Sequence, residues 1–167
     1  MPDTPMRLSC RVYYEDTDAA GIVYYANYLR FLERGRTELL RSLGHEQSAL
    51  VQQLRSRAVE QSTLSSPLRM ATRQMAFAVR SVHAEYLKPA KLDDLIVVET
   101  AIESVGRVQV MFTQRIMRGG EQLLDAKIRV ACIDPTLGRP VSMPHDIYQQ
   151  LKTLMAQPPA ALAEFPE

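Results

Sequence analysis

The chain has 167 residues, and its 20 lysines and arginines balance 19 aspartates and glutamates to a net charge of +1. This length predicts a single domain, which buries about 70% of the surface that its unfolded chain exposes. A net charge this close to zero removes the bulk electrostatic attraction on which non-specific binding to nucleic acid or to a membrane surface depends. We therefore expect no nucleic-acid partner.

Hydropathy and cysteine usage suggest a compartment. No apolar stretch approaches the roughly 18 residues that cross a bilayer, and the amino terminus lacks the apolar centre of a signal peptide. The two cysteines, Cys10 and Cys132, are too few for a disulfide scaffold and lack CxxC spacing. Both fall in apolar, strand-like patterns, so we predict buried free thiols. These features favour a cytoplasmic protein without stable membrane insertion.

The first predicted elements are a strand over residues 7–14 and, after a polar turn, an amphipathic helix over residues 25–43. The helix is indicated by leucines at the three- and four-residue spacing of one helix face, namely Leu29, Leu32, Leu39 and Leu43. Gly44 marks its end. Gly35 lies on or near the buried stripe, where a glycine costs about 1 kcal/mol relative to alanine unless close packing compensates. We therefore predict that this helix packs closely on a sheet.

The second half of the chain is predicted to be mostly strands. Residues 51–75 are rich in glutamine, serine and arginine, and we interpret them as a short helix followed by a loop. Strands follow over residues 77–87, 95–104, 108–117 and 123–133. In the last of these, apolar residues alternate with charged ones, and Gly119-Gly120 before it is a hairpin signal. A short helix over residues 146–155 precedes the tail.

This order of elements predicts the α+β class. One strand, one long helix and four strands in mostly hairpin connection form an antiparallel sheet of about five strands, with the helix against one face. We assign residues 1–145 to a single domain, with residues 51–75 as an insertion. Residues 146–167 form a short helix and a C-terminal tail.

Several motifs of nucleotide-binding and hydrolytic proteins are absent from the sequence. The glycine positions allow no GxSxG elbow, no GxGxxG fingerprint and no P-loop. The three histidines, His45, His83 and His145, are far apart in sequence and lack the spacing of a zinc site. We accordingly expect neither a metal nor a cofactor.

Residues 13–28, YYEDTDAAGIVYYANY, hold five of the seven tyrosines and the carboxylates Glu15, Asp16 and Asp18. One interpretation is a structural turn, in which these aspartates accept hydrogen bonds from local amides and Gly21 adopts a positive φ. A second interpretation is catalytic, because the unpaired amides and positive dipole end of the following helix stabilise developing negative charge. A carboxylate just before that end could attack an acyl group whose oxygen accepts hydrogen bonds from those amides.

A third interpretation takes Asp16-Thr17-Asp18 as a DxD motif that holds a metal for phosphoryl or glycosyl transfer. This motif is weak, because no nucleotide- or phosphate-binding motif accompanies it.

Two longer segments resemble a known family. They are YYEDTDAAGIVYYANYLRFLERGRTELL at residues 13–40 and VRSVHAEYLKPAKLDDLIVVET at residues 79–100. Both resemble the hotdog-fold acyl-CoA thioesterases, in the branch associated with the bacterial Tol–Pal system and related to 4-hydroxybenzoyl-CoA thioesterase. With the following strands, the resemblance covers roughly three quarters of the chain.

The resemblance implies a sheet wrapped around the long helix, assembled into dimers and often into homotetramers that are dimers of dimers, with sites at subunit interfaces. It implies an acyl-CoA substrate, or an acyl-carrier-protein thioester, that is hydrolysed to a carboxylic acid and a free thiol without a cofactor. Asp18 matches the catalytic aspartate of the family, acting as nucleophile or as general base. Tyr25 matches the residue whose backbone amide polarises the thioester carbonyl, although nearer relatives usually carry histidine there.

Substrate binding is expected at further positions. Gly21 lies in the same turn, and Lys88 and Lys91 could meet the phosphates of coenzyme A or form a solvated basic loop. The alternative ligands for these phosphates are the arginines of residues 51–75, namely Arg55, Arg57, Arg69 and Arg73. Glu33 and Arg36 could orient site groups or form an exposed ion pair.

Two other functions stay open. A hotdog hydratase would normally use a histidine with an acid on the helix, and the predicted helix contains no histidine. A non-catalytic acyl-carrier or envelope-complex partner is suggested only by the family association.

Overall fold

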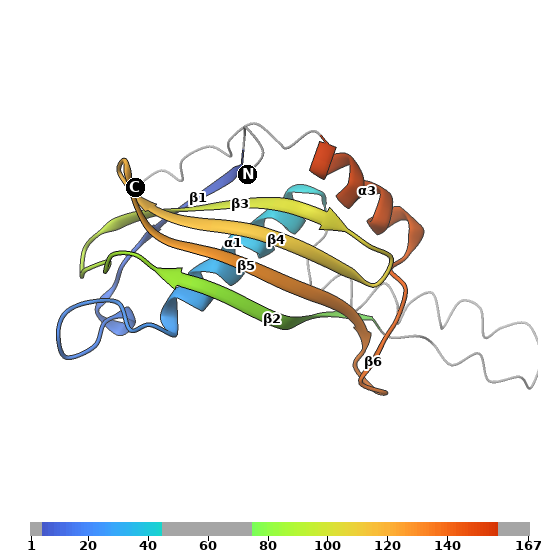
Figure 1. Ribbon diagram of the computed structural model, residues 1–167, viewed down its shortest axis with the longest axis horizontal. Helices are drawn as coiled ribbons and strands as arrows, with labels where there is room; N and C mark the ends of the chain where they lie inside the picture. Colours follow the sequence, from blue (N-terminus) through green and yellow to red (C-terminus); the bar gives the residue numbers. More distant parts are fainter. Residues whose placement is uncertain (1–4, 45–74, 157–167) are drawn as a thin grey trace, which may run out of the picture.

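The computed structural model describes residues 5–44 and 75–156. Its elements are β1 (Met6–Arg11), the 3₁₀ turn η1 (Tyr14–Asp16), α1 (Asn27–Ser42), β2 (Ala76–Tyr86), β3 (Leu95–Val105), β4 (Gln109–Arg118), β5 (Glu121–Asp134), β6 (Arg139–Pro140) and α3 (His145–Ala156). The strands form one antiparallel sheet in the order β1-β3-β4-β5-β2, and β6 pairs with β5. Helix α1 crosses one face of this sheet, which confirms the predicted α+β arrangement (Figure 1).

The middle of the sheet follows the predicted hairpins. Strands β4 and β5 join at Gly119 and Gly120, and Gly119 has the positive φ of +58° that a tight turn favours. Strand β2 pairs with β5 rather than with β3, and β1 pairs with β3. The 11-residue β2 is therefore an edge strand.

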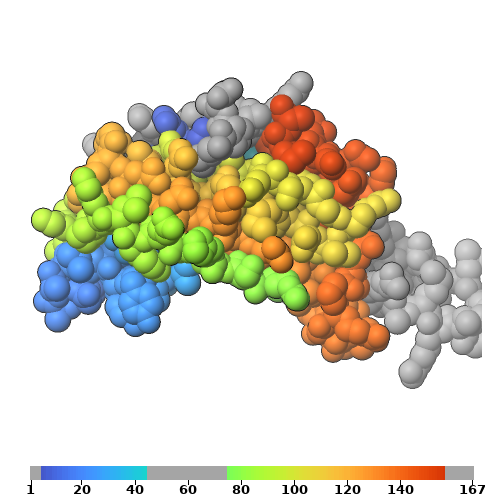
Figure 2. Space-filling view, in the orientation of Figure 1, coloured from blue at the N-terminus to red at the C-terminus, as the bar shows by residue number. Residues whose placement is uncertain are grey.

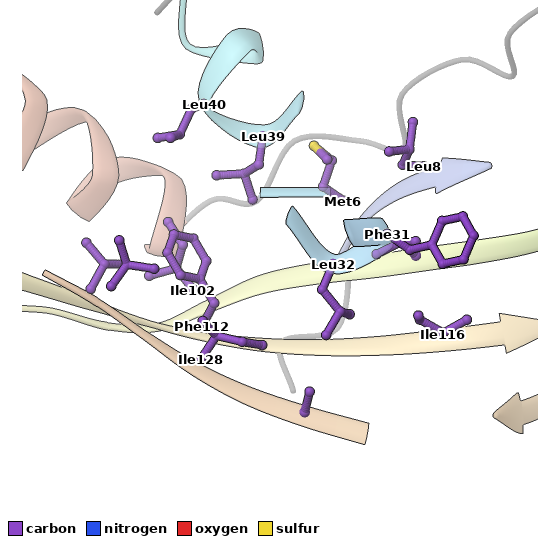
Figure 3. Packing of buried hydrophobic residues seen from close by; sticks show 14 of the residues in the cluster. Met6, Leu8, Phe31, Leu32, Leu39, Leu40, Ile102, Phe112, Ile116 and Ile128 are labelled. Atoms are coloured by element: carbon purple, nitrogen blue, oxygen red, sulfur yellow. The ribbon is translucent and has the colours of Figure 1, made fainter. Parts of the chain in front are cut away.

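The core lies between α1 and the inner face of the sheet. Figure 3 shows Phe31, Leu32 and Leu39 of α1 pointing toward the apolar side chains of the strands. Each of these three helix residues is at most 2% exposed. Helix α3 covers one end of this core, to which it contributes Ile147, Leu151 and Leu154.

Gly35 brings α1 very close to β3. A Cβ atom on Gly35 would lie 2.7 Å from the Oγ1 of Thr100 and 2.8 Å from Cγ1 of Val98. The predicted close packing of the helix on the sheet at this glycine is confirmed. Beside it, the fully buried Gln114 donates from Nε2 to the carbonyl of Leu32 at 2.9 Å and to the Oγ1 of Thr100 at 2.8 Å. This polar contact fixes the position of α1 along the sheet.

Some element boundaries and one burial expectation were wrong. Helix α1 begins at Asn27 instead of residue 25, because the Asn27 amide first closes a turn on the carbonyl of Tyr24. Strand β1 ends at Arg11, and the next residues turn into η1. Cys132 is buried as predicted, but Cys10 is only partly buried. The predicted insertion at residues 51–75 lies outside the described residues except for Met75.

The two faces of the sheet differ in chemistry. Figure 2 looks onto the face opposite α1, where β2, β5 and β4 are seen side by side. This outer face carries the ion pairs Arg7–Glu99, Arg115–Asp125 and Lys127–Glu103. Among the described residues, no helix is both long and apolar enough to cross a membrane.

Candidate active site at the turn before helix α1

Asp18 begins the tight turn of a short reversal of the chain. Thr17 and Val23 form an isolated antiparallel bridge, and the Asp18 amide donates to the carbonyl of Ile22 at 2.9 Å. Gly21 closes the reversal with a φ of +72°, and its amide donates to the carbonyl of Asp18 at 3.0 Å. The turn geometry expected at Gly21 is therefore present.

The two aspartates of the DTD sequence have different environments. Asp16 is 2% exposed, and its Oδ2 accepts a hydrogen bond from the Tyr13 amide at 2.9 Å. Asp18 is exposed, and its Oδ1 accepts the local amide of Ala20 at 2.8 Å. Asp16 therefore supports the turn, whereas the Asp18 carboxylate is accessible to a substrate. No cluster of metal-ligating side chains exists in the described ranges.

Where the turn enters α1, two backbone amides have no acceptor among the described residues. The Tyr24 amide donates to the carbonyl of Asp16 and the Asn27 amide donates to the carbonyl of Tyr24. Between them, the amides of Tyr25 and Ala26 donate no hydrogen bond within the described part of the chain. They precede the positive dipole end of α1, where an anionic oxygen is stabilised. Tyr25 thus lies in the turn, not in the helix.

The side chain of Tyr25 is not part of the core. It is 62% exposed, and its ring centroid lies 4.6 Å from that of Tyr24. This exposure leaves the side chain free to form a wall of a substrate site, a role separate from that of its backbone amide.

The loop between β2 and β3 holds the turn in place through backbone hydrogen bonds. Ile22 bridges to Lys91, the Val23 amide donates to the carbonyl of Ala90 at 2.9 Å, and the Leu92 amide donates to the carbonyl of Gly21 at 3.3 Å. The buried Tyr28 on α1 accepts the Ala90 amide on its phenol oxygen at 2.8 Å. Burial raises the pKa of Tyr28, so the phenol stays protonated.

Arg118, which the sequence analysis missed, fixes this loop to β4. Its guanidinium donates to Asp94 Oδ2 at 2.6 Å and to Glu121 Oε2 at 2.5 Å. Lys88 is paired with the same Glu121 at 2.5 Å. Hydrogen bonds from Lys88 and Arg118 lower the pKa of Glu121. The charge of Lys88 is therefore already shared, whereas the exposed Lys91 ammonium forms no ion pair with any described residue.

Tyr86 is the second residue that sequence reasoning missed. It lies at the end of β2, and its hydroxyl donates to the carbonyl oxygen of Tyr25 at 3.1 Å. Its ring stands edge-on to Tyr28, with centroids 5.5 Å apart.

A groove lies between α1 and the edge strand β2. One part, of about 440 Å³, is lined by residues that include Leu29, Arg30, Glu33 and Val82, and a neighbouring part of about 110 Å³ reaches Leu151. Arg36 lines both parts.

The expected pairing of Glu33 with Arg36 does not form in the structure. Arg36 is 9% exposed and donates to Oε1 of Gln114 at 2.7 Å, while Glu33 accepts the hydroxyl of Thr37 at 2.6 Å. Burial lowers the pKa of the Arg36 guanidinium, and the charge of Glu33 counteracts this effect.

Comparison with known sequences decides the family. The sequence model of the thioesterase-like superfamily matches residues 12–151. The chain belongs to this superfamily. The family confirms the resemblance to hotdog thioesterases and the enzyme class that it implies, a thioester hydrolase.

Individual relatives agree with this assignment. The acyl-CoA thioesterase YbgC of Haemophilus influenzae is 39% identical over 147 residues, which cover 88% of this chain and 94% of the relative. The acyl-CoA thioester hydrolase YbgC of Escherichia coli O6:H1 is 40% identical over 153 residues, which cover 91% of this chain and 99% of the relative.

Solved structures share the hotdog fold. The probable thioesterase of Bartonella henselae superimposes with a TM-score of 0.69 at 30% identity, covering 84% of this chain and all of that one. A thioesterase of Thermus thermophilus, solved with coenzyme A and zinc, has a TM-score of 0.67 at 21% identity, and the match covers 95% of this chain and all of that one.

Proposed function

We propose that the protein hydrolyses an acyl-CoA thioester to a carboxylic acid and free coenzyme A. The observation that carries the proposal is the turn before α1, where the exposed carboxylate of Asp18 precedes the unpaired amides of Tyr25 and Ala26. Hydrolysis of a thioester needs a base or nucleophile and a donor for the carbonyl oxygen. The names of the relatives supply the coenzyme A part of the proposal.

In the proposed reaction, the Tyr25 amide donates to the thioester oxygen as negative charge develops there. Asp18 acts in one of two ways, and both need its carboxylate at this position. As a nucleophile it attacks the carbonyl carbon, the carbon–sulfur bond breaks, and water then hydrolyses the mixed anhydride. As a general base it takes a proton from the attacking water, and the thiolate leaves with the electron pair of the carbon–sulfur bond.

The phosphates of coenzyme A are proposed to contact the basic loop at Lys88 and Lys91, next to the Gly21 turn. Lys91 bridges through its backbone to Ile22 and carries an exposed ammonium group. Lys88 contributes less, because Glu121 already shares its charge.

The protein is proposed to assemble through β2, as a dimer and further as a dimer of dimers. The free edge of this strand leaves backbone groups unpaired, which a second copy can satisfy. Val79 and Val82 on β2 are 52% and 41% exposed, and both line the groove next to α1. Light scattering tests the assembly: a mass near 18.9 kDa at micromolar concentration with full activity would contradict it.

The function is tested by thiol release from a panel of acyl-CoA thioesters and acyl-carrier-protein thioesters of different chain length, aliphatic and aromatic. Release of thiol from at least one member supports the proposal and identifies the carrier. Hydration of an enoyl-CoA without thiol release would instead indicate a hydratase. Binding without either reaction would indicate a non-catalytic acyl-carrier or envelope-complex partner.

A further inference from the structure

We infer that Tyr86 is a positioning residue for a second oxyanion donor, the backbone amide of Ala26. The inference rests on the proposed thioester hydrolysis and adds two groups to it. Neither the motif that resembles the family nor the match to the superfamily assigns a role to Tyr86 or to Ala26.

The first step is the contact between Tyr86 and the turn. The phenol hydroxyl of Tyr86 donates to the carbonyl oxygen of Tyr25 at 3.1 Å, over a sequence separation of 61 residues. That carbonyl belongs to the same peptide unit as the Ala26 N–H. Because a trans peptide is planar, its C=O and N–H point in opposite directions. A hydroxyl that fixes the Tyr25 oxygen therefore also fixes the direction of the Ala26 N–H.

The second step is the availability of this N–H. The Ala26 amide has no acceptor among the described residues, and neither has the Tyr25 amide. Each of these amides shares a peptide unit with a carbonyl that accepts a hydrogen bond. The Tyr24 carbonyl, in the unit of the Tyr25 amide, accepts the Asn27 amide, and the Tyr25 carbonyl, in the unit of the Ala26 amide, accepts the Tyr86 hydroxyl. Such a bond polarises the peptide and strengthens its N–H as a donor. Two adjacent strengthened donors can bind the same oxyanion.

The third step is the rigidity of the support. Tyr86 packs edge-on against Tyr28, whose phenol oxygen accepts the Ala90 amide, and the carbonyl of Ala90 accepts the amide of Val23. The contacts therefore form a closed ring from the turn to β2, to α1, to the loop and back to the turn. A ring of this kind holds Tyr86 in place although its side chain is 48% exposed.

The direct test is Tyr86→Phe, which removes the hydroxyl and keeps the ring that contacts Tyr28. We expect kcat to fall by about tenfold while KM stays within about twofold, since a misdirected donor costs less than the roughly 10² to 10³ of a deleted one. The matched control is Tyr148→Phe, which removes a phenol hydroxyl on α3 while the ring keeps its contacts with Arg107 and Lys152. It should leave kcat unchanged.

A second variant removes the proposed donor itself. Ala26→Pro deletes the N–H, and the φ of −73° at Ala26 matches that of proline. Because proline also disfavours a helical backbone at the preceding Tyr25, the kcat of this variant is compared only after circular dichroism and the thermal midpoint match those of the wild type. We expect a loss of about 10²-fold in kcat. In this background, adding Tyr86→Phe should cost less than about twofold, because both changes act on one N–H. Multiplicative losses in the double variant would overturn the inference.

A spectroscopic measurement distinguishes a change in the direction of the Ala26 N–H from a general loss of stability. The carbonyl stretch of a bound ketone analogue, in which a methylene group separates the carbonyl from sulfur, reports hydrogen bonds to its oxygen. We expect this frequency to rise in both Tyr86→Phe and Ala26→Pro relative to the wild type. An unchanged frequency in folded Ala26→Pro would overturn the inference even if Tyr86→Phe proved insoluble.

The outcome for the wild-type protein keeps the two proposals apart. If the wild type releases no thiol from any thioester of the panel, the proposed function fails and this inference fails with it. If the wild type is active and Tyr86→Phe retains more than about half of kcat, the inference alone is wrong.

Discussion

A Cβ atom on Gly35 would lie 2.7 Å from the Oγ1 of Thr100, closer than side chains normally approach. At this point the backbone of α1 therefore packs directly against the side chains of β3. Thr100 also accepts the amide of Gln114, so the hydroxyl cannot easily move away. The position of the helix on the sheet depends on the absence of a side chain at residue 35.

Gly35→Ala is expected to destabilise the protein by about 1–3 kcal/mol, the usual cost of overpacking. The substitution does this although alanine is favoured over glycine in a helix by about 1 kcal/mol. Urea unfolding gives the measurement. Gly120→Ala is the control, because nothing lies within 4 Å of the Cβ position there. Equal midpoints for the two variants would show that Thr100 gives way.

Asp18→Asn is expected to lower turnover by at least about 10²-fold, since positioned proton transfer alone is worth roughly 10² to 10⁴. The fold should be retained, because the amide oxygen can still accept the Ala20 N–H. Steady-state thiol release measures the effect. Retention of more than about a tenth of the wild-type activity would remove Asp18 from its proposed role.

Asp16→Asn is the matched control for Asp18. It weakens the acceptor of the Tyr13 amide at a buried site, so the main expected effect is a loss of stability of about 1–3 kcal/mol. If Asp16→Asn abolished turnover in a stable protein and Asp18→Asn did not, the assignment of the two aspartates would be reversed.

Tyr25→Phe is expected to keep turnover within about tenfold, and Tyr25→His to redistribute activity among acyl groups, because both keep the backbone N–H. Tyr25→Pro deletes that donor and should lose on the order of 10²-fold. The acyl-CoA panel measures all three variants. A folded Tyr25→Phe as inactive as Asp18→Asn would show that the phenol itself takes part in the reaction.

Lys91→Ala is expected to raise KM for a coenzyme A thioester by about two- to fivefold, as loss of an exposed ion pair worth about 0.5–1 kcal/mol does. The N-acetylcysteamine thioester of the same acyl group lacks the phosphates, so its KM should not change. Lys88→Ala should act more weakly, because Lys88 is paired with Glu121. Equal effects of Lys91→Ala on both thioesters would argue against phosphate binding.

Cys132 gives a prediction for alkaline pH. Burial raises the pKa of its thiol from 9.0 to about 11, so the folded protein keeps the proton when the unfolded chain has lost it. Because the unfolded chain gains stability when it loses this proton, the contribution of Cys132 to the free energy of unfolding is fully present below pH 9 and is lost as the pH rises toward 11. Urea unfolding of Cys132→Ala should show a shallower fall over this range than the wild type does. Parallel falls would mean that the thiol titrates normally.

The sequence predicted those elements whose signal is local. The spacing of Leu32 and Leu39 on α1 and the alternation along β5 were sufficient for the helix, the strands and the packing of one on the other. The pairing of β2 with β5 connects segments that are distant in the sequence, and no periodicity records it. The start of α1 was wrong because the turn at Tyr24 is held by the carbonyl of Asp16, a contact between separate segments.

The same limit applies to the candidate site. Asp18 and Tyr25 were found because they lie in one short motif of unusual composition. Arg118 and Tyr86 were missed because the contacts that connect them to the site, with Asp94 and Tyr25, span 24 and 61 residues of sequence. A single arginine or tyrosine at a strand end has no distinguishing pattern.

The close contact at Gly35 makes the first part of α1 a spacer of fixed length. From Gly35 back to Ala26 the chain makes about two and a half helical turns. One inserted or deleted residue in this stretch would rotate the Ala26 amide by about 100° and shift it by about 1.5 Å, away from Tyr86. This contact therefore constrains the number of residues in the stretch, whereas it places no constraint on the side chains that point away from the sheet.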